Sequence, residues 1–211
     1  GRACARRLLA AENRVVAVDL EREALETALG AESDCLKFFT GDVARTMTAN
    51  GAAALAVESF GGVDGLAHFA AAHSKLNWEQ ADEEEFNRIM SVNITGPFLM
   101  AKAAAQVMID QGTKGAIVLT SSGGVLMGGT GENGRGGPAY TTSKGGVLVL
   151  VRTLAKSWGK YGIRVNAISP GVVETAMTSE YSDEAMAGAA SRAALGRVSQ
   201  PEEQAEAAIW L

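Results

Sequence analysis

Short apolar runs rich in β-branched residues alternate along this chain with longer segments of helical period. The runs predict strands at 14–19, 37–40, 65–70, 116–121 and 164–169. The other segments predict helices at 2–11, 21–29, 44–60, 83–111 (with a break near Gly96-Pro97), 139–161 and 201–211. Strands that alternate with helices form right-handed βαβ units, which build a parallel sheet covered on both faces. The expected fold class is therefore α/β, a three-layer doubly wound parallel sheet.

Composition indicates one globular domain and excludes several classes of partner. The chain has 211 residues, 47% of them hydrophobic, and no repeat or linker, so residues 1–211 are expected to form a single domain. A formal net charge of -5 without a basic run argues against nucleic acid as a partner. No apolar run approaches a membrane span, and Cys4 and Cys35 lack the spacing of metal ligands. We expect a cytoplasmic protein with reduced thiols and no metal site.

Both ends of the chain are expected to be cut. The sequence begins on a predicted helix and stops within another, at 201–211. In the strand order 3-2-1-4-5-6, the strand before the first helix lies centrally, and its absence leaves the neighbouring strands unpaired. We therefore expect a strand and a glycine turn before Gly1, and a helix end and a strand after Leu211.

The start of the chain fits the second half of a dinucleotide-binding pattern. Gly1 begins a predicted helix, and the strand that follows ends in Asp19, at the spacing where an acidic residue binds the ribose hydroxyls. A carboxylate at this position repels a 2′-phosphate, so Asp19 favours NAD over NADP. Arg22 is near enough to weaken this preference, but Glu21 adds a second acid. The alternative is that Asp19 caps the next helix.

A second glycine pattern, at 129–134, matches G-x-G-x-x-G but is not interpreted as a nucleotide site. It does not directly follow a predicted strand, and no amphipathic helix begins after it. No acidic residue occurs between Glu132 and Glu174 to bind a ribose. The pattern predicts a flexible loop that can fold over a substrate.

The strongest candidates for chemistry are Tyr140 and Lys144, four residues apart in a predicted helix. Residues at this spacing share a helix face, so the ammonium is expected to lower the phenol pKa from about 10 and make Tyr140 a usable acid or base. The preceding strand ends in Ser121-Ser122, and ligands bind beyond the carboxyl ends of such strands. A serine hydroxyl is therefore expected beside Tyr140 to bind a substrate oxygen. Asn93 either holds a water or a backbone carbonyl through its amide, or is an ordinary kink residue.

Together these motifs resemble the short-chain dehydrogenase/reductase family over essentially the whole chain. The matching segments are Tyr140-Thr-Thr-Ser-Lys144, Ser121-Ser122, Ser91-Val92-Asn93, Gly41-Asp42-Val43, Arg164-Val165-Asn166-Ala167 and Pro170-Gly171-Val172-Val173-Glu174-Thr175. The resemblance implies a catalytic tetrad. Its members would be Tyr140 as acid/base, Lys144 binding the nicotinamide ribose and tuning Tyr140, Ser122 polarising the carbonyl, and Asn93 anchoring a proton-relay water. Ser122 is preferred to Ser121 because it matches the second serine of the family's pair.

The resemblance also implies NAD as the cofactor and a set of residues that would bind it. Asp42 and Val43 would contact the adenine, and the turn at 170–175 would hold the nicotinamide carboxamide. The segment 183–195 resembles the family's mobile substrate helix. The expected cofactor-binding positions are Gly1, Asp19, Asp42, Val43, Ala70, Tyr140, Lys144, Pro170, Gly171, Val173 and Thr175.

The sequence departs from the family pattern at three points, one of which is the missing glycine-rich turn before Gly1. The family's Asn-Asn-Ala-Gly is His-Phe-Ala-Ala at 68–71, and the Cβ of Ala71 puts a cofactor contact there in question. We interpret His68 as a satisfied core residue rather than a catalyst. The spacing from Ser122 to Tyr140 exceeds the family norm by the length of the glycine loop, which would make the site wider or more mobile.

The expected function is hydride transfer between NAD(H) and a secondary alcohol or ketone, with Tyr140 as acid/base. The alternatives are an NADPH-dependent 3-ketoacyl reductase, which Asp19 disfavours, and a catalytically inactive dinucleotide-binding scaffold or sensor. His73 and Trp78 are either pocket-lining or surface residues.

The run 147–151 is apolar all round the helix, so that helix must be covered on two sides. One side is expected to pack on the sheet. The other is expected to meet a second subunit, giving a homodimer or homotetramer as in the family. The alternative is a helix buried wholly within the monomer.

Overall fold

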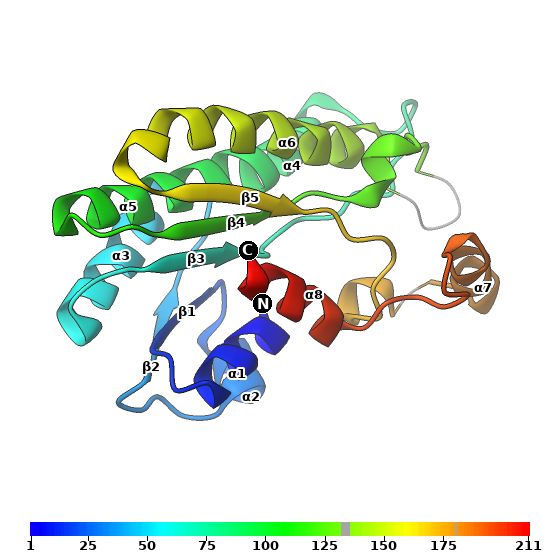
Figure 1. Cartoon of the computed structure of the whole chain (residues 1–211). Helices are drawn as coiled ribbons and strands as arrows, with labels where there is room; N and C mark the ends of the chain where they lie inside the picture. Colours follow the sequence, from blue (N-terminus) through cyan, green and yellow to red (C-terminus); the bar gives the residue numbers. More distant parts are fainter. Residues whose placement is uncertain (132–135, 180) are drawn as a thin grey trace.

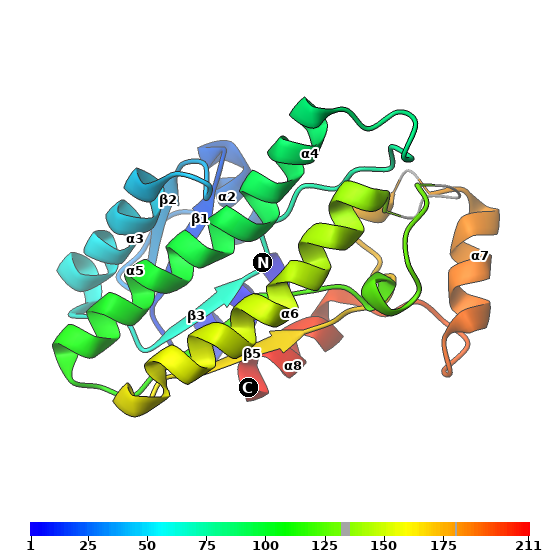
Figure 2. The same cartoon turned by 90° about the horizontal axis from the view of Figure 1, so that it is seen from above.

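Five parallel strands form the central layer of the fold (Figures 1 and 2). In this computed structural model, which describes residues 1–131, 136–179 and 181–211, each strand coincides with or lies close to its predicted position. The strands are β1 (Val15–Asp19), β2 (Leu36–Thr40), β3 (Gly65–His68), β4 (Ala116–Thr120) and β5 (Arg164–Ile168). The α/β class predicted from the alternating pattern is confirmed.

Helices cover both faces of the strands (Figure 1). On one face lie α3 (Thr46–Phe60), α4 (Glu83–Met90), α5 (Gly96–Gln111) and α6 (Pro138–Trp158). On the other lie α1 (Arg2–Ala10), α2 (Arg22–Leu29) and α8 (Pro201–Trp210). The helix α7 (Asp183–Arg192) stands apart, beyond the end of the sheet toward which β3, β4 and β5 run.

The sheet is in two pieces. β1 pairs with β2, and β4 pairs with β3 on one side and β5 on the other, all in parallel. Among the residues that the structure describes, β1 and β3 are not hydrogen-bonded to each other.

The main core lies between β4 and the helices α5 and α6. Ile117 and Leu119 of β4 are fully buried, and they belong to one cluster with Met108 of α5 and Val147 of α6. Three buried alanines on α5, Ala101, Ala104 and Ala105, complete this cluster. Their small side chains let the helix backbone lie close to the sheet.

The long helical segment 83–111 is interrupted directly before the predicted break near Gly96-Pro97. A π-helical stretch, Ser91–Thr95, separates α4 from α5 and contains Asn93. Pro97 then falls in the first turn of α5, directly after the π-helical stretch. Gly96 packs closely on Val43, because a Cβ at this position would lie 3.0 Å from the Val43 side chain, which would have to shift.

The described part of the glycine loop packs closely against the segment 74–77. The Gly137 N–H donates to the Ser74 carbonyl at 2.8 Å, and a Cβ on Gly137 would collide with the Leu76 carbonyl. Gly131, with φ of +85°, makes a similar close approach to this segment. Residues 132–134 of the G-x-G-x-x-G pattern lie outside the described residues. Glycine is therefore required here for backbone-to-backbone packing.

The apolar run of α6 is largely covered within the monomer. Val147 is buried, Leu150 and Val151 pack against the same core, and Val149 is 62% exposed. Most of the run that predicted a subunit contact is therefore covered inside the monomer. Val149 is the member of the run that faces outward. None of the described helices is both long and apolar enough to cross a bilayer.

The tight contact at Gly137 predicts a loss of stability on adding one methyl group. We expect G137A to lower the free energy of unfolding by about 1–3 kcal/mol, since the backbone must move to make room. Gly159 is the matched control, because its backbone is helical (φ −57°) and nothing lies within 4 Å of its missing Cβ. Urea denaturation should show G159A equal to the wild type or about 0.4–1 kcal/mol more stable. Equal stability of both variants would contradict this packing.

Candidate active site

A cavity of about 780 Å³ opens at the carboxyl ends of β4 and β5, between α1, α6 and α7. Ligands bind at this edge of an open α/β sheet. The sequence-predicted residues that line it are Gly1, Ser122, Tyr140, Lys144, Pro170, Gly171, Val173 and Thr175. The predicted residues Asp19, Asp42, Val43, Ala70 and Asn93 are not among its lining.

Two hydrogen bonds hold the first turns of α6 against the end of β4. The Lys144 ammonium donates to the Thr120 carbonyl at 2.9 Å, and the Ser121 hydroxyl donates to the Lys144 carbonyl at 2.8 Å. Both side chains are buried. Pro138 occupies the start of α6, which suits a residue without an N–H, and Tyr140 therefore lies in the first turn.

The two neighbouring serines have different surroundings. The hydroxyl of Ser121 is buried and bonded to Lys144, so it is not available to a ligand. Ser122 caps a short 3₁₀-helix, accepting a hydrogen bond from the Gly124 N–H at 3.1 Å, and it lines the cavity together with Tyr140. The structure thus brings Ser122, rather than Ser121, beside the phenol.

The expected effect of Lys144 on Tyr140 is absent from the structure, and this corrects the prediction from spacing. Burial raises the pKa of the Tyr140 phenol, while hydrogen bonding with Ser122 opposes that shift. The Lys144 nitrogen lies 5.8 Å from the centre of the Tyr140 ring and donates a hydrogen bond to the Thr120 carbonyl. Burial also lowers the pKa of Lys144 to about 8. Near pH 7 the site therefore holds a neutral phenol beside an ammonium.

Asn93 connects three parts of the chain through its side-chain amide, which is 1% exposed. The amide nitrogen donates to the Ala72 carbonyl and to the Ser143 hydroxyl, both at 2.9 Å. Its oxygen accepts from the Ala72 N–H at 2.8 Å. Both amide hydrogens are therefore occupied, and the side chain has no donor left for the relay water implied by the resemblance. Of the alternatives predicted for Asn93, the structure therefore shows the one in which the amide binds a backbone carbonyl, that of Ala72.

The two histidines differ in position and in role. His68 is buried at the end of β3, and burial together with the Lys144 charge lowers its pKa to about 4. Its Nε2 lacks a hydrogen-bond partner among the described residues, so the interpretation as a core residue holds but the expected satisfied state does not. His73 lines the cavity, its ring 4.6 Å from that of Tyr140. Trp78 is 77% exposed and does not line the cavity.

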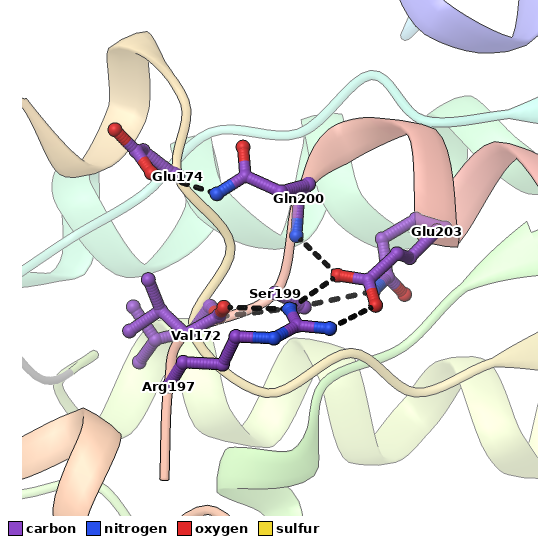
Figure 3. Close-up of polar contacts among 8 residues, drawn as sticks. Val172, Glu174, Arg197, Ser199, Gln200 and Glu203 are labelled. Atoms are coloured by element: carbon purple, nitrogen blue, oxygen red, sulfur yellow. Dashed lines mark hydrogen bonds and ion pairs between the residues drawn. The ribbon is translucent and has the colours of Figure 1, made fainter. Parts of the chain in front are cut away.

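The loop after β5 forms another wall of the cavity and is held by the segment before α8 (Figure 3). The Ser199 N–H donates to the Val172 carbonyl at 3.1 Å, and the Glu174 N–H donates to the Ser199 carbonyl at 2.9 Å. The Gln200 amide then donates to the Glu174 carboxylate at 2.8 Å. Sequence reasoning missed Ser199 and Gln200, since no motif connects them with a turn more than 20 residues earlier.

Asp19 ends β1 with an exposed carboxylate that accepts a hydrogen bond from the next N–H in the chain. It does not cap α2, because the capping position there is Glu21 and no side-chain cap is formed. The capping alternative is therefore wrong. Arg22 is bound to Glu26 at 2.9 Å and Glu32 at 2.8 Å, so its guanidinium is already neutralised.

The residues expected near an adenine are held by local structure. The Asp42 carboxylate accepts a hydrogen bond from the Ala44 N–H at 2.9 Å. The side chain of Val43 is buried in a core cluster with Met100, so only its backbone is left to meet a ligand. Ala70 follows β3 and is exposed. No group of ligating side chains suited to a metal ion occurs within the described ranges.

Comparisons with known proteins agree with this architecture. A family model described as enoyl-(acyl carrier protein) reductase matches residues 1–211. The chain is 36% identical over 216 residues to a 2,5-dichloro-2,5-cyclohexadiene-1,4-diol dehydrogenase of Sphingobium indicum, with 100% of this chain and 84% of the relative covered. It is 37% identical over 185 residues to a 2-(R)-hydroxypropyl-CoM dehydrogenase of Xanthobacter autotrophicus, covering 84% of this chain and 72% of that protein.

A solved structure supports the same assignment. The crystal structure of a short-chain dehydrogenase/reductase, a glucose/ribitol dehydrogenase from Brucella melitensis, superimposes with a TM-score of 0.89 at 28% identity. The match covers 100% of this chain and 83% of that structure. Sequence and fold therefore agree over the full length of the chain. The chain belongs to the short-chain dehydrogenase/reductase family of oxidoreductases.

Proposed function

We propose that this protein interconverts a secondary alcohol and its ketone, with NAD(H) as hydride carrier. The observation that carries the proposal is the convergence of Ser122, Tyr140 and Lys144 on one cavity at the carboxyl edge of the sheet. A volume of about 780 Å³ is within the usual range for ligand pockets, and the same cavity extends to Gly1 at the start of α1. The nicotinamide, when bound, supplies or accepts the hydride.

The roles of the three side chains follow from their surroundings. The Ser122 hydroxyl hydrogen-bonds with Tyr140 in the structure. We propose that it turns to donate to the substrate oxygen when substrate binds, which holds that oxygen beside the Tyr140 phenol. Tyr140 then gives its proton to that oxygen in reduction and takes it back in oxidation. Its raised pKa keeps the phenol protonated near pH 7, which suits proton donation. Lys144 fixes the helix and places a positive charge near the site.

NAD is proposed over NADP because of the charges at the end of β1. The Asp19 carboxylate is exposed there, and a 2′-phosphate beside it would be repelled. Arg22 is the nearby cation that could offset this repulsion, but its guanidinium is already paired with two glutamates. We further propose a cytoplasmic location, since Cys4 and Cys35 are both unpaired thiols.

Removing the phenol hydroxyl tests the proposed chemistry. We expect Y140F to lower kcat/KM by at least 100-fold, the lower end of the usual contribution of general acid–base catalysis, while NAD binding is retained. Y161F is the matched control, because Tyr161 is 43% exposed and does not line the cavity. The rates are measured on a panel of secondary alcohols and ketones from the absorbance of the reduced nicotinamide. Retained activity in Y140F would contradict the role of Tyr140 as acid/base. NAD binding without turnover in the wild type would instead favour the scaffold or sensor.

The cofactor assignment is tested by comparing the two nicotinamide dinucleotides. We expect kcat/KM with NAD to exceed that with NADP by about tenfold or more, and D19A to reduce this ratio by removing the repulsion. D34A, which removes an exposed carboxylate elsewhere, should leave the ratio unchanged. A wild type that prefers NADP and reduces 3-ketoacyl substrates would replace this proposal with the ketoacyl reductase, a possibility consistent with the family description that names an acyl carrier.

We also propose that the protein is a homodimer or homotetramer through α6, whose Val149 is the exposed member of an otherwise buried apolar run. V149D should dissociate the assembly, because a charge would be buried at the interface. R152A, one turn further on, is the control that keeps Val149 in place. Light scattering of the wild type and both variants measures the mass. A monomeric wild type would contradict the assembly.

A further inference from the structure

His73 lies against the proton-transferring residue of the proposed mechanism but has no part in that mechanism. Its ring centre is 4.6 Å from that of Tyr140, and the two ring planes are inclined by 60°. Both side chains line the same cavity. An imidazole in this position lies next to the phenol, within the cavity where the substrate would bind.

The backbone on each side of His73 is held in place. Asn93 binds both the N–H and the carbonyl of Ala72, at 2.8 and 2.9 Å. On the other side, the carbonyl of Ser74 accepts a hydrogen bond from the Gly137 N–H at 2.8 Å. A side chain between two fixed neighbours loses little freedom when a ligand binds, which is typical of preorganised recognition.

The charge state of His73 restricts what it can recognise. Burial, followed by the charges of Lys75 and Lys144, lowers the pKa of His73. A neutral imidazole has one N–H donor and one nitrogen acceptor. This pair matches a hydroxyl, which also donates and accepts, better than it matches a carboxylate. The lining of the same cavity also includes the apolar Met127 and Met177.

We propose that His73 is a specificity-determining residue that hydrogen-bonds a second hydroxyl of the substrate, an inference that rests on the proposed function. The preferred substrates would then be diols and the corresponding hydroxy ketones, in which this hydroxyl lies close to the carbon that reacts. Ser122 and Tyr140 bind the reacting oxygen, and His73 binds the other. The family relative from Sphingobium indicum is named for a diol, which agrees with such a site.

The test compares diols with the matching monoalcohol. Wild type, H73F, H73Q and W78F are assayed with NAD on cyclohexane-1,2-diol, cyclohexane-1,4-diol and cyclohexanol. We expect the wild type to prefer one of the diols, and H73F to lower the ratio of kcat/KM for that diol to kcat/KM for cyclohexanol by about tenfold or more. H73Q, which keeps a donor and an acceptor, should restore most of the ratio. W78F, an exposed residue of the same loop, should keep the wild-type ratio.

Several results would overturn the inference. An equal loss on all three substrates in H73F would make His73 merely structural, and an unchanged ratio would exclude it from recognition. Activity on cyclohexanol without diol preference would overturn this inference alone, whereas inertness on all substrates would overturn the proposed function with it. If H73F melts below the assay temperature, H73L serves as the same test.

Discussion

The site depends on the attachment of α6 to the end of β4. The Lys144 ammonium donates a hydrogen bond to the Thr120 carbonyl, and the Ser121 hydroxyl donates one to the Lys144 carbonyl, so strand and helix are joined in both directions. Burying an ammonium is costly unless it is hydrogen-bonded, and the lowered pKa of Lys144, about 8, reflects that cost. Because these bonds fix the helix, Tyr140 one turn earlier comes to lie beside Ser122. Lys144 therefore acts as a positioning residue as well as a source of positive charge.

A second attachment determines the surroundings of Tyr140. Asn93 lies in a π-helical stretch, a kind of distortion often found at functional sites, and its amide binds both the loop after β3 and Ser143 of α6. The same loop is held from its other side by Gly137. The glycine loop and the asparagine therefore act together, because each fixes one neighbour of His73. Figure 2 shows α4 leading into α5, with α6 alongside, over the strands that carry the site.

Most of the fold could be predicted from sequence because it depends on local pattern. Every strand was expected from a short apolar run, and the choice of Ser122 over Ser121 agrees with the geometry. The pKa of Tyr140 could not be predicted, since spacing shows that an ammonium is near but not that a carbonyl binds it or how deeply the phenol is buried. The partners of Asn93, 21 and 50 positions away, are likewise set by the tertiary fold. His73 carried no motif, and only its place beside Tyr140 identifies it.

We propose that this cavity transfers a hydride from a carbinol carbon to a nicotinamide. A secondary alcohol deuterated at that carbon tests the transfer when it is incubated with the protein and NAD and the nicotinamide product is analysed by mass spectrometry. We expect the reduced nicotinamide to gain the deuterium and the ketone to appear in equal amount. Reduced nicotinamide without deuterium, or ketone formed without reduction of NAD, would contradict it.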